Sequence, residues 1–260
     1  MFVSLVSLSF CVLTAFGLRG GLSAPRSTGT DWEGRVLAIL AFGAACVLFG
    51  PLYGSAIVLS VMLHEFGHVA AYRVIGHDDA RFRPLPLMGG VAISDRLPDT
   101  EEESFFVSLM GPGICLAPMV LAYALHGPVS GIDLRAGEFL WAFAITTGAM
   151  NFFNLLPLWP LDGGRCARNV VAAVSPAAAG QLAPIMAAAL IAAAIALQSV
   201  PLTFFALMGA QSVIASGGDL GQPRMGPWRA LLGFAAWIFT LAAFALGGWP
   251  MIAWLWGLFG

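Results

Sequence analysis

The chain has 260 residues, of which 59% are hydrophobic and 10% are charged, and its formal net charge is −2. In soluble domains about a quarter of the residues are charged, so this composition excludes an ordinary soluble globular protein. We therefore predict a polytopic membrane protein that is surrounded by the lipid bilayer and has no nucleic-acid partner.

Long segments without Asp, Glu, Lys or Arg predict the membrane spans. A bilayer core is about 30 Å thick, and a helix needs about 20 residues to cross it. Glycine and proline divide these segments into about eight predicted transmembrane helices, at residues 2–18, 36–50, 54–75, 104–125, 138–157, 178–199, 201–217 and 229–247. Residues 249–260 either extend the last helix or lie in the membrane interface. The predicted fold class is therefore all-α, with about eight transmembrane helices and one short membrane-associated β-hairpin.

The arginine residues predict how these helices are oriented. All 12 basic residues are arginine, and assigning the loops alternately to the two sides puts eleven of them on one side and only Arg135 on the other. Cytoplasmic loops are enriched in basic residues, so both chain ends are expected to face away from the cytoplasm. No basic residue precedes the first apolar segment, so residues 2–18 are expected to be a retained span rather than a cleaved signal peptide.

The segment VMLHEFGHVAAYRVIG, residues 61–76, places His64, Glu65 and His68 within a predicted span. Histidines four residues apart lie on one face of a helix and can bind one cation, with the adjacent glutamate beside a metal-bound water. The pattern also occurs by chance, but an ionisable group at mid-bilayer costs at least about 2.5 kcal/mol and is a functional candidate. The helical rise puts His68 about 7.5 Å and His64 about 13.5 Å from Arg73, inside the membrane near its cytoplasmic face.

Residues 84–94, PLPLMGGVAIS, predict the β-hairpin. Two short apolar segments flank the Gly89-Gly90 pair, and a Gly-Gly pair between such segments is typical of a hairpin turn.

Asp162, in the segment NFFNLLPLWPLDGGR, is the candidate for a third metal ligand. Two histidines leave a catalytic zinc site one protein ligand short. Asp162 follows an uncharged span and precedes Arg165, which the predicted topology puts on the same side as Arg73, so its depth matches that of the histidines. A turn residue at the end of a helix is the alternative interpretation.

HEFGH and NLLPLWPLDGG, residues 154–164, together resemble the signature of the site-2 protease family of intramembrane zinc metalloproteases, peptidase family M50. This family carries HExxH on one span and NxxPxxxLDGG on a later one. The resemblance implies one Zn²⁺ per chain, with ligands His64, His68 and Asp162, the general base Glu65, and Asn154 as a polar contact near the substrate or the developing oxyanion. Asn151 either joins Asn154 near the site or packs between spans.

Two segments between these motifs resemble the family more weakly. Residues 84–94 resemble its β-loop, which dips into the membrane beside the active site, and this implies that Gly89 and Gly90 contact the substrate. Residues 109–113, LMGPG, resemble its glycine-proline segment, although the Asn that usually follows is absent here.

We therefore predict two N-terminal transmembrane helices (residues 1–53), a catalytic three-helix core (54–168) and C-terminal transmembrane helices (169–260). The predicted function is that of an intramembrane zinc metalloprotease that cleaves the transmembrane segments of membrane-anchored protein substrates. We expect a multi-pass protein of the bacterial inner membrane with its active site towards the cytoplasm; the sequence indicates no oligomeric state. The alternatives are a metal-ion transporter that uses an intramembrane His/Glu/Asp site, and an inactive homologue that acts as a scaffold.

Overall fold

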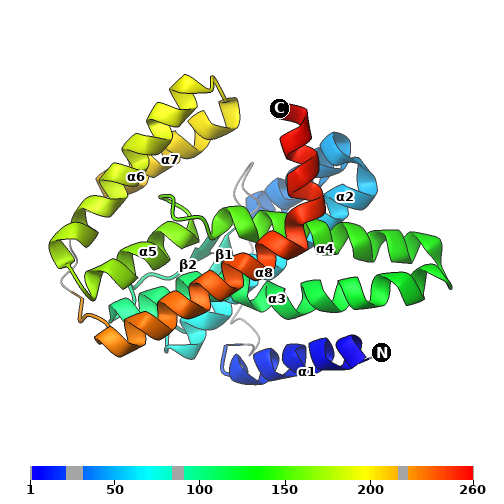
Figure 1. The fold of residues 1–260 in the computed structure, drawn as a ribbon, viewed down its shortest axis with the longest axis horizontal. Coiled ribbons are helices and arrows are strands. Elements are labelled where there is room, and N and C mark those ends of the chain that lie inside the picture. Colours follow the sequence, from blue (N-terminus) through cyan, green and yellow to red (C-terminus); the bar gives the residue numbers. More distant parts are fainter. Residues whose placement is uncertain (1, 22–31, 84–90, 216–221, 260) are drawn as a thin grey trace. The chain divides into compact units, whose positions relative to one another are not determined.

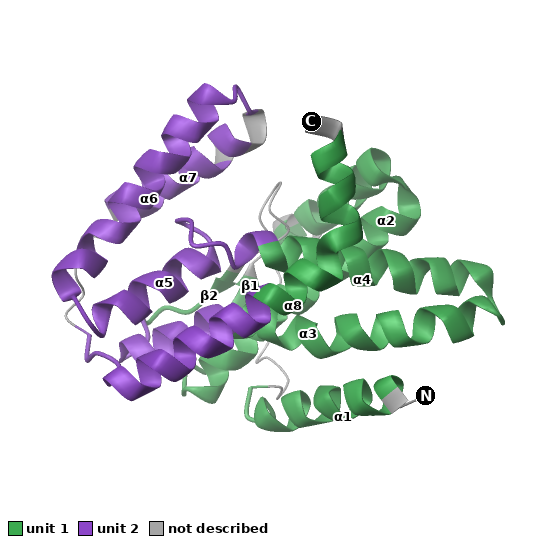
Figure 2. Ribbon diagram, in the orientation of Figure 1, with its two compact units in different colours: residues 1–96, 110–152, 242–260 green, residues 97–109, 153–241 purple. Residues whose placement is uncertain are grey.

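The computed structural model describes residues 2–21, 32–83, 91–215 and 222–259 (Figure 1). These residues form eight α-helices and one two-stranded sheet, so the predicted mainly helical fold with a short hairpin is confirmed. They divide into two compact units (Figure 2). Unit 1 comprises residues 1–96, 110–152 and 242–260, and unit 2 comprises residues 97–109 and 153–241.

Four of the described helices are long and apolar enough to cross a membrane. They are α2 (Trp32–Val74), α3 (Glu101–Ser130), α6 (Pro176–Ala196) and α8 (Pro227–Phe259). The remaining helices are α1 (Phe2–Gly17), α4 (Leu134–Asn154), α5 (Asp162–Ala172) and α7 (Val200–Ala215). A chain with several such apolar helices is an integral membrane protein.

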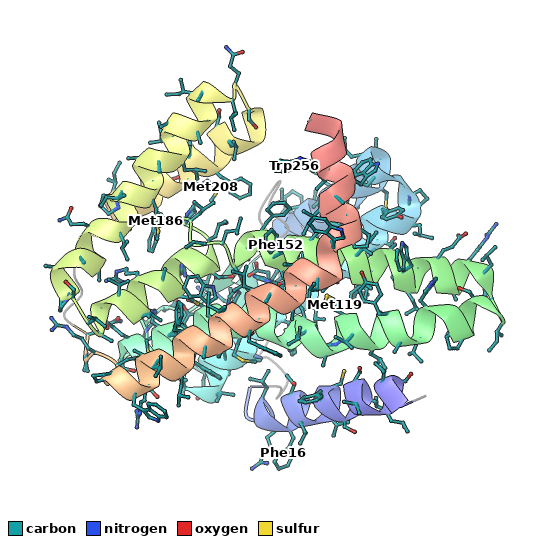
Figure 3. All side chains as sticks on the ribbon, viewed as in Figure 1. Phe16, Met119, Phe152, Met186, Met208 and Trp256 are labelled. Carbon is teal, nitrogen blue, oxygen red and sulfur yellow. The ribbon has the colours of Figure 1, made fainter. Side chains whose placement is uncertain are left out.

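Large apolar side chains cover the outside of these helices (Figure 3). Phe16 of α1 is 62% exposed and Trp256 of α8 is 80% exposed. Val47 and Leu48 of α2 are exposed as well. Contiguous apolar surface of this kind is rare on a soluble monomer, and in a bilayer it faces the lipid.

The boundary predicted between residues 50 and 54 is observed as a break inside α2, at Gly50. Gly50 has φ +80° and ψ 159°, and Pro51 follows it inside the helix. A positive φ is readily adopted only by glycine, and proline is tolerated in the first turn of a helix because its missing N–H has no intrahelical partner there. Residues on either side of Gly50 therefore form two helical segments, as the sequence predicted. A Cβ on Gly54 would lie 2.6 Å from the backbone nitrogen of Cys46, so the two segments pack against each other beside this break.

The C-terminal residues extend the last helix, which is one of the two alternatives that the sequence left open. α8 continues through Gly247 and Gly248 to Phe259. A Cβ on Gly148 of α4 would lie 2.3 Å from the backbone nitrogen of Gly248. Small residues allow membrane helices to approach closely, so these glycines pack α4 against α8 within unit 1 rather than break the helix.

In unit 2, α5 is a helix that the sequence analysis did not predict. It has 11 residues, so it is too short for a membrane span. One of its faces is buried, with Asp162 and Cys166, whereas Arg165 between them is exposed. α5 packs against α6, and α6 packs along α7. Buried Leu190, Ala194 and Ala206 form the apolar contact between these last two helices.

The hairpin consists of β1 (Arg81–Arg83) and β2 (Val91–Ile93), which pair antiparallel with Phe82 opposite Ala92. The second predicted strand is thus observed, whereas the described first strand precedes the predicted segment. Residues 84–90, with the predicted Gly89-Gly90 turn, lie outside the described residues.

Replacing Gly148 with alanine should destabilise the protein, because the new methyl group would meet the backbone of Gly248. Overpacking of this kind costs about 1–3 kcal/mol. The matched control is Gly43→Ala, since a Cβ there meets nothing within 4 Å. Thermal unfolding in detergent should show a lower Tm for Gly148→Ala alone; equal shifts would contradict the close helix contact.

Candidate metal centre

The two histidines of HEFGH converge on one point in unit 1. His64 and His68 are buried, with 3% and 8% of their surface exposed. Their Nε2 atoms lie 3.1 Å apart, and the ring planes are inclined by 81°. Two nitrogens at about 2.0–2.1 Å from one tetrahedral zinc ion are about 3.3 Å apart. The pair therefore has the separation that two ligands of one zinc ion require.

Two glycines make room for the histidine rings between α2 and α3. A Cβ on Gly67 would lie 2.3 Å from the carbonyl oxygen of Met110, so the two helices touch at this turn. A Cβ on Gly111 would lie 2.2 Å from Nε2 of His68. Glycine at position 111 is thus required by the position of the imidazole, which gives the LMGPG segment a physical role.

Glu65 lies beside the hairpin. Its Oε2 atom accepts a hydrogen bond of 3.0 Å from the backbone N–H of Ala92 in β2. The backbone N–H groups of a strand point sideways from its two edges, within the plane of the sheet. The Ala92 N–H therefore lies on the edge of β2 that faces α2. The carboxylate of Glu65, the candidate general base, therefore lies between α2 and β2. The side chain is half-buried.

Arg73 in the last turn of α2 donates to the carbonyl oxygen of Ala80, at 2.8 Å, and polar side chains join the two sides of the hairpin base. Oδ2 of Asp79 accepts hydrogen bonds from the backbone N–H of Asp95, at 2.5 Å, and from the Ser94 hydroxyl, at 3.0 Å. The Asp95 N–H is the main cause that lowers the pKa of the Asp79 carboxyl below its ordinary value. Arg81 contacts the Asp95 carboxylate through two nitrogens, at 3.1 and 3.0 Å. These polar contacts therefore join the two sides of the hairpin base.

Asp162 begins α5 in unit 2. It is buried, with 8% of its surface exposed, and the positive end of the helix dipole stabilises a carboxylate there. The Asn154 amide donates a hydrogen bond of 2.9 Å to Oδ2 of Asp162. A Cβ on Gly163 would lie 2.0 Å from the carbonyl oxygen of Leu155, so the preceding loop folds directly onto the first turn of α5 and fixes the position of the carboxylate.

The structure thus brings the predicted site residues together in two groups. His64, Glu65 and His68 share one turn of α2 in unit 1, and Asn154 contacts Asp162 in unit 2. That one ion joins the two groups stays a prediction, as does the contact of Gly89 and Gly90 with a substrate. The contact of Asn154 with Asp162 is a finding that sequence reasoning missed, since it had placed this amide near the substrate or the developing oxyanion.

Asn151 is a further residue whose place the sequence left open. Its Oδ1 atom lies 2.7 Å from Nδ1 of His64, and its side chain is fully buried. The only sequence feature that could have indicated this contact is an amide side chain within an uncharged span. Packing between spans explains such a residue equally well.

Comparisons with known proteins point to zinc metalloproteases. Residues 124–197 match the model of peptidase family M50, a region that includes the LDGG motif. Zinc metalloprotease MJ0392 of Methanocaldococcus jannaschii is 28% identical over 113 residues, which are 44% of this chain and 32% of that protein. Stage IV sporulation protein FB of Bacillus subtilis is 32% identical over 111 residues, which are 42% of this chain and 36% of that protein. The matches thus span about a third of these relatives' length.

Replacing Gly111 with alanine should displace the His68 ring and weaken metal binding, because the added methyl group and Nε2 would overlap. We expect the zinc dissociation constant to rise about tenfold or more, as measured by chelator competition. Gly113→Ala is the matched control, since its Cβ would meet only the flexible Met110 side chain, at 3.4 Å. Unchanged affinity in both variants would show that Gly111 does not shape the site.

Proposed function

We propose that this chain is a member of peptidase family M50 and an intramembrane zinc metalloprotease that cleaves membrane-anchored protein substrates. The observation that carries the proposal is the approach of the two Nε2 atoms to 3.1 Å inside an apolar, membrane-spanning helix, with Glu65 on the same turn. Neither an ordinary packing contact nor a solvated loop accounts for three ionisable side chains there.

One zinc ion per chain, bound by His64, His68 and Asp162, is the metal centre that we propose. The chemistry of this donor set supports it, because two histidines and one carboxylate are a recurrent ligand set of catalytic zinc sites. The similarity to zinc metalloprotease MJ0392 supports zinc as the metal. The contact of Asn154 with Asp162 supports a role for this amide in orienting the carboxylate. This role is in addition to the substrate contact that the motif implies.

Zinc, when bound, supplies a water molecule whose pKa is lowered to about 7. Glu65 is placed to accept the proton of that water as it attacks the scissile carbonyl, and to deliver the proton to the leaving nitrogen. The Ala92 N–H keeps the Glu65 carboxylate oriented until then. The protein residues therefore provide the base and its orientation.

A helical substrate must unwind before its carbonyl groups can be reached, and an extended segment in lipid then needs new hydrogen-bond partners. The hairpin supports strand addition as the source of those partners, because β2 lies against the turn that carries Glu65. We further propose about eight membrane spans, a bacterial inner-membrane location and an active site towards the cytoplasm, as the arginine distribution indicates.

The test of the function is Glu65→Gln in the purified full chain and in cells. This variant should keep its zinc, because Glu65 is not a proposed ligand, and it should lose cleavage of epitope-tagged single-span membrane proteins co-expressed with it. Asp162→Ala should lose both. The matched control is Glu138→Gln, which changes an exposed glutamate of α4 and should leave fragment formation unchanged.

Two outcomes would overturn the proposal. Cleavage that persists in Glu65→Gln would remove the assigned base. Zinc flux into vesicles that contain the purified chain, persisting in the same variant, would favour the metal transporter instead, because transport needs ligands and no general base.

Replacing Gly89 and Gly90 with valine should reduce turnover more than zinc content, because the loop would contact the substrate and not the ion. Single-turnover cleavage and metal content, measured on the same preparations, check this prediction. An equal loss of both would argue against a substrate-binding loop.

A further inference from the structure

We propose that Asn151 selects the tautomer of His64 that binds the metal, and that it is a positioning residue of the site. The inference rests on the proposed function, since it assigns a role towards the bound zinc ion. It starts from the 2.7 Å contact between Oδ1 of Asn151 and Nδ1 of His64. Both side chains are buried, with 0% and 3% of their surface exposed.

The orientation of the Asn151 amide is fixed by its own helix. Its Nδ2 atom donates a hydrogen bond of 2.9 Å to the carbonyl oxygen of Thr147. A flipped amide would place two acceptor oxygens against each other, because a carbonyl cannot donate. The oxygen of the amide must therefore face His64.

An acceptor oxygen at Nδ1 requires that this nitrogen carries the proton. In a neutral imidazole one nitrogen is a donor and the other an acceptor, so Nε2 of His64 carries the lone pair. The same Nε2 lies 3.1 Å from Nε2 of His68. These two nitrogens are the atoms that would bind the proposed zinc ion. Asn151 thus presets the ring for metal binding at the correct atom.

A second link one turn away keeps the two helices in register. The Ser60 hydroxyl donates to the carbonyl oxygen of Ala56, at 2.8 Å, so the hydroxyl of Thr147 donates to Ser60, at 2.5 Å. Ser60 and His64 are four residues apart on α2, and Thr147 and Asn151 are four residues apart on α4. Two successive turns of these helices are therefore joined by buried hydrogen bonds.

Packing alone does not require an amide at this position. A buried polar group costs free energy unless it is hydrogen-bonded, and a leucine of similar size would fill the same space. The outer nitrogen of a metal-binding histidine, in contrast, usually donates to an acceptor, and loss of that partner typically weakens metal affinity 10–100-fold. The polar residue is explained by the ligand that it orients.

The experiment compares Asn151→Leu, which has no acceptor, with Asn151→Asp, which keeps one for the Nδ1 proton. The control is Asn169→Leu, because Asn169 is equally buried, at 1% exposed, but donates to Ser104 in unit 2. For the full chain in detergent, we would measure the zinc dissociation constant by chelator competition and the visible spectrum of the cobalt-loaded protein. We expect about 10–100-fold weaker zinc binding and an altered cobalt spectrum for Asn151→Leu. Asn151→Asp should stay near the wild type.

Equal zinc affinity of the wild type and Asn151→Leu would overturn the inference and leave the proposed function standing. So would an equal loss of affinity in Asn169→Leu, since that would be a general effect of removing a buried amide. A wild type without zinc affinity would instead overturn the proposed function.

Nitrogen-15 shifts of the His64 ring in the metal-free wild type test the tautomer without any variant or metal. A proton on Nδ1 supports the inference, and a proton on Nε2 overturns it, whether or not Asn151→Leu folds.

Discussion

Inside a bilayer there is no water to receive a hydrogen bond, so the partners of a polar side chain must come from the protein itself. The hydroxyl groups of the apolar helices meet this constraint locally, by donating to the carbonyl oxygen four residues earlier. Ser60, Ser108, Thr146 and Thr240 do so. Ring and amide groups need partners on other segments, as Trp237 shows by donating to the carbonyl oxygen of Leu155. The polar residues around His64 are therefore where α2 and α4 must meet in a defined register.

Glycine makes such meetings possible. Gly67 and Gly111 bring α2 and α3 close beside the histidines, and Gly148 and Gly248 bring α4 and α8 together. Because apolar side chains gain little by leaving lipid for a helix interface, close backbone contact is a main source of attraction between membrane helices. The small residues thus set both the packing of unit 1 and the space in which the imidazole rings stand.

The approach of the two histidines could be predicted from the sequence, whereas contacts between distant segments could not. HEFGH is a local pattern, and the approach of His64 to His68 follows from helical periodicity alone. The break at Gly50 could also be predicted, because a glycine followed by a proline favours the end of one helix and the start of another. Helix α5 escaped prediction because it is an amphipathic segment of only 11 residues that begins with Asp-Gly-Gly, a sequence more typical of a turn. The role of Asn151 depends on α2 and α4 lying side by side, which a single sequence does not state.

The length of α8 has a mechanical consequence. Its 33 residues measure about 50 Å along the helix axis, whereas the hydrocarbon core is about 30 Å thick. Such a rod cannot stand upright with its whole apolar length in acyl chains, so it must lean, or bend at Pro250, to shed the mismatch. Packing against neighbouring helices, such as the contact of Gly248 with Gly148 of α4, sets the inclination of α8, and the surrounding bilayer then adapts its thickness at a modest cost.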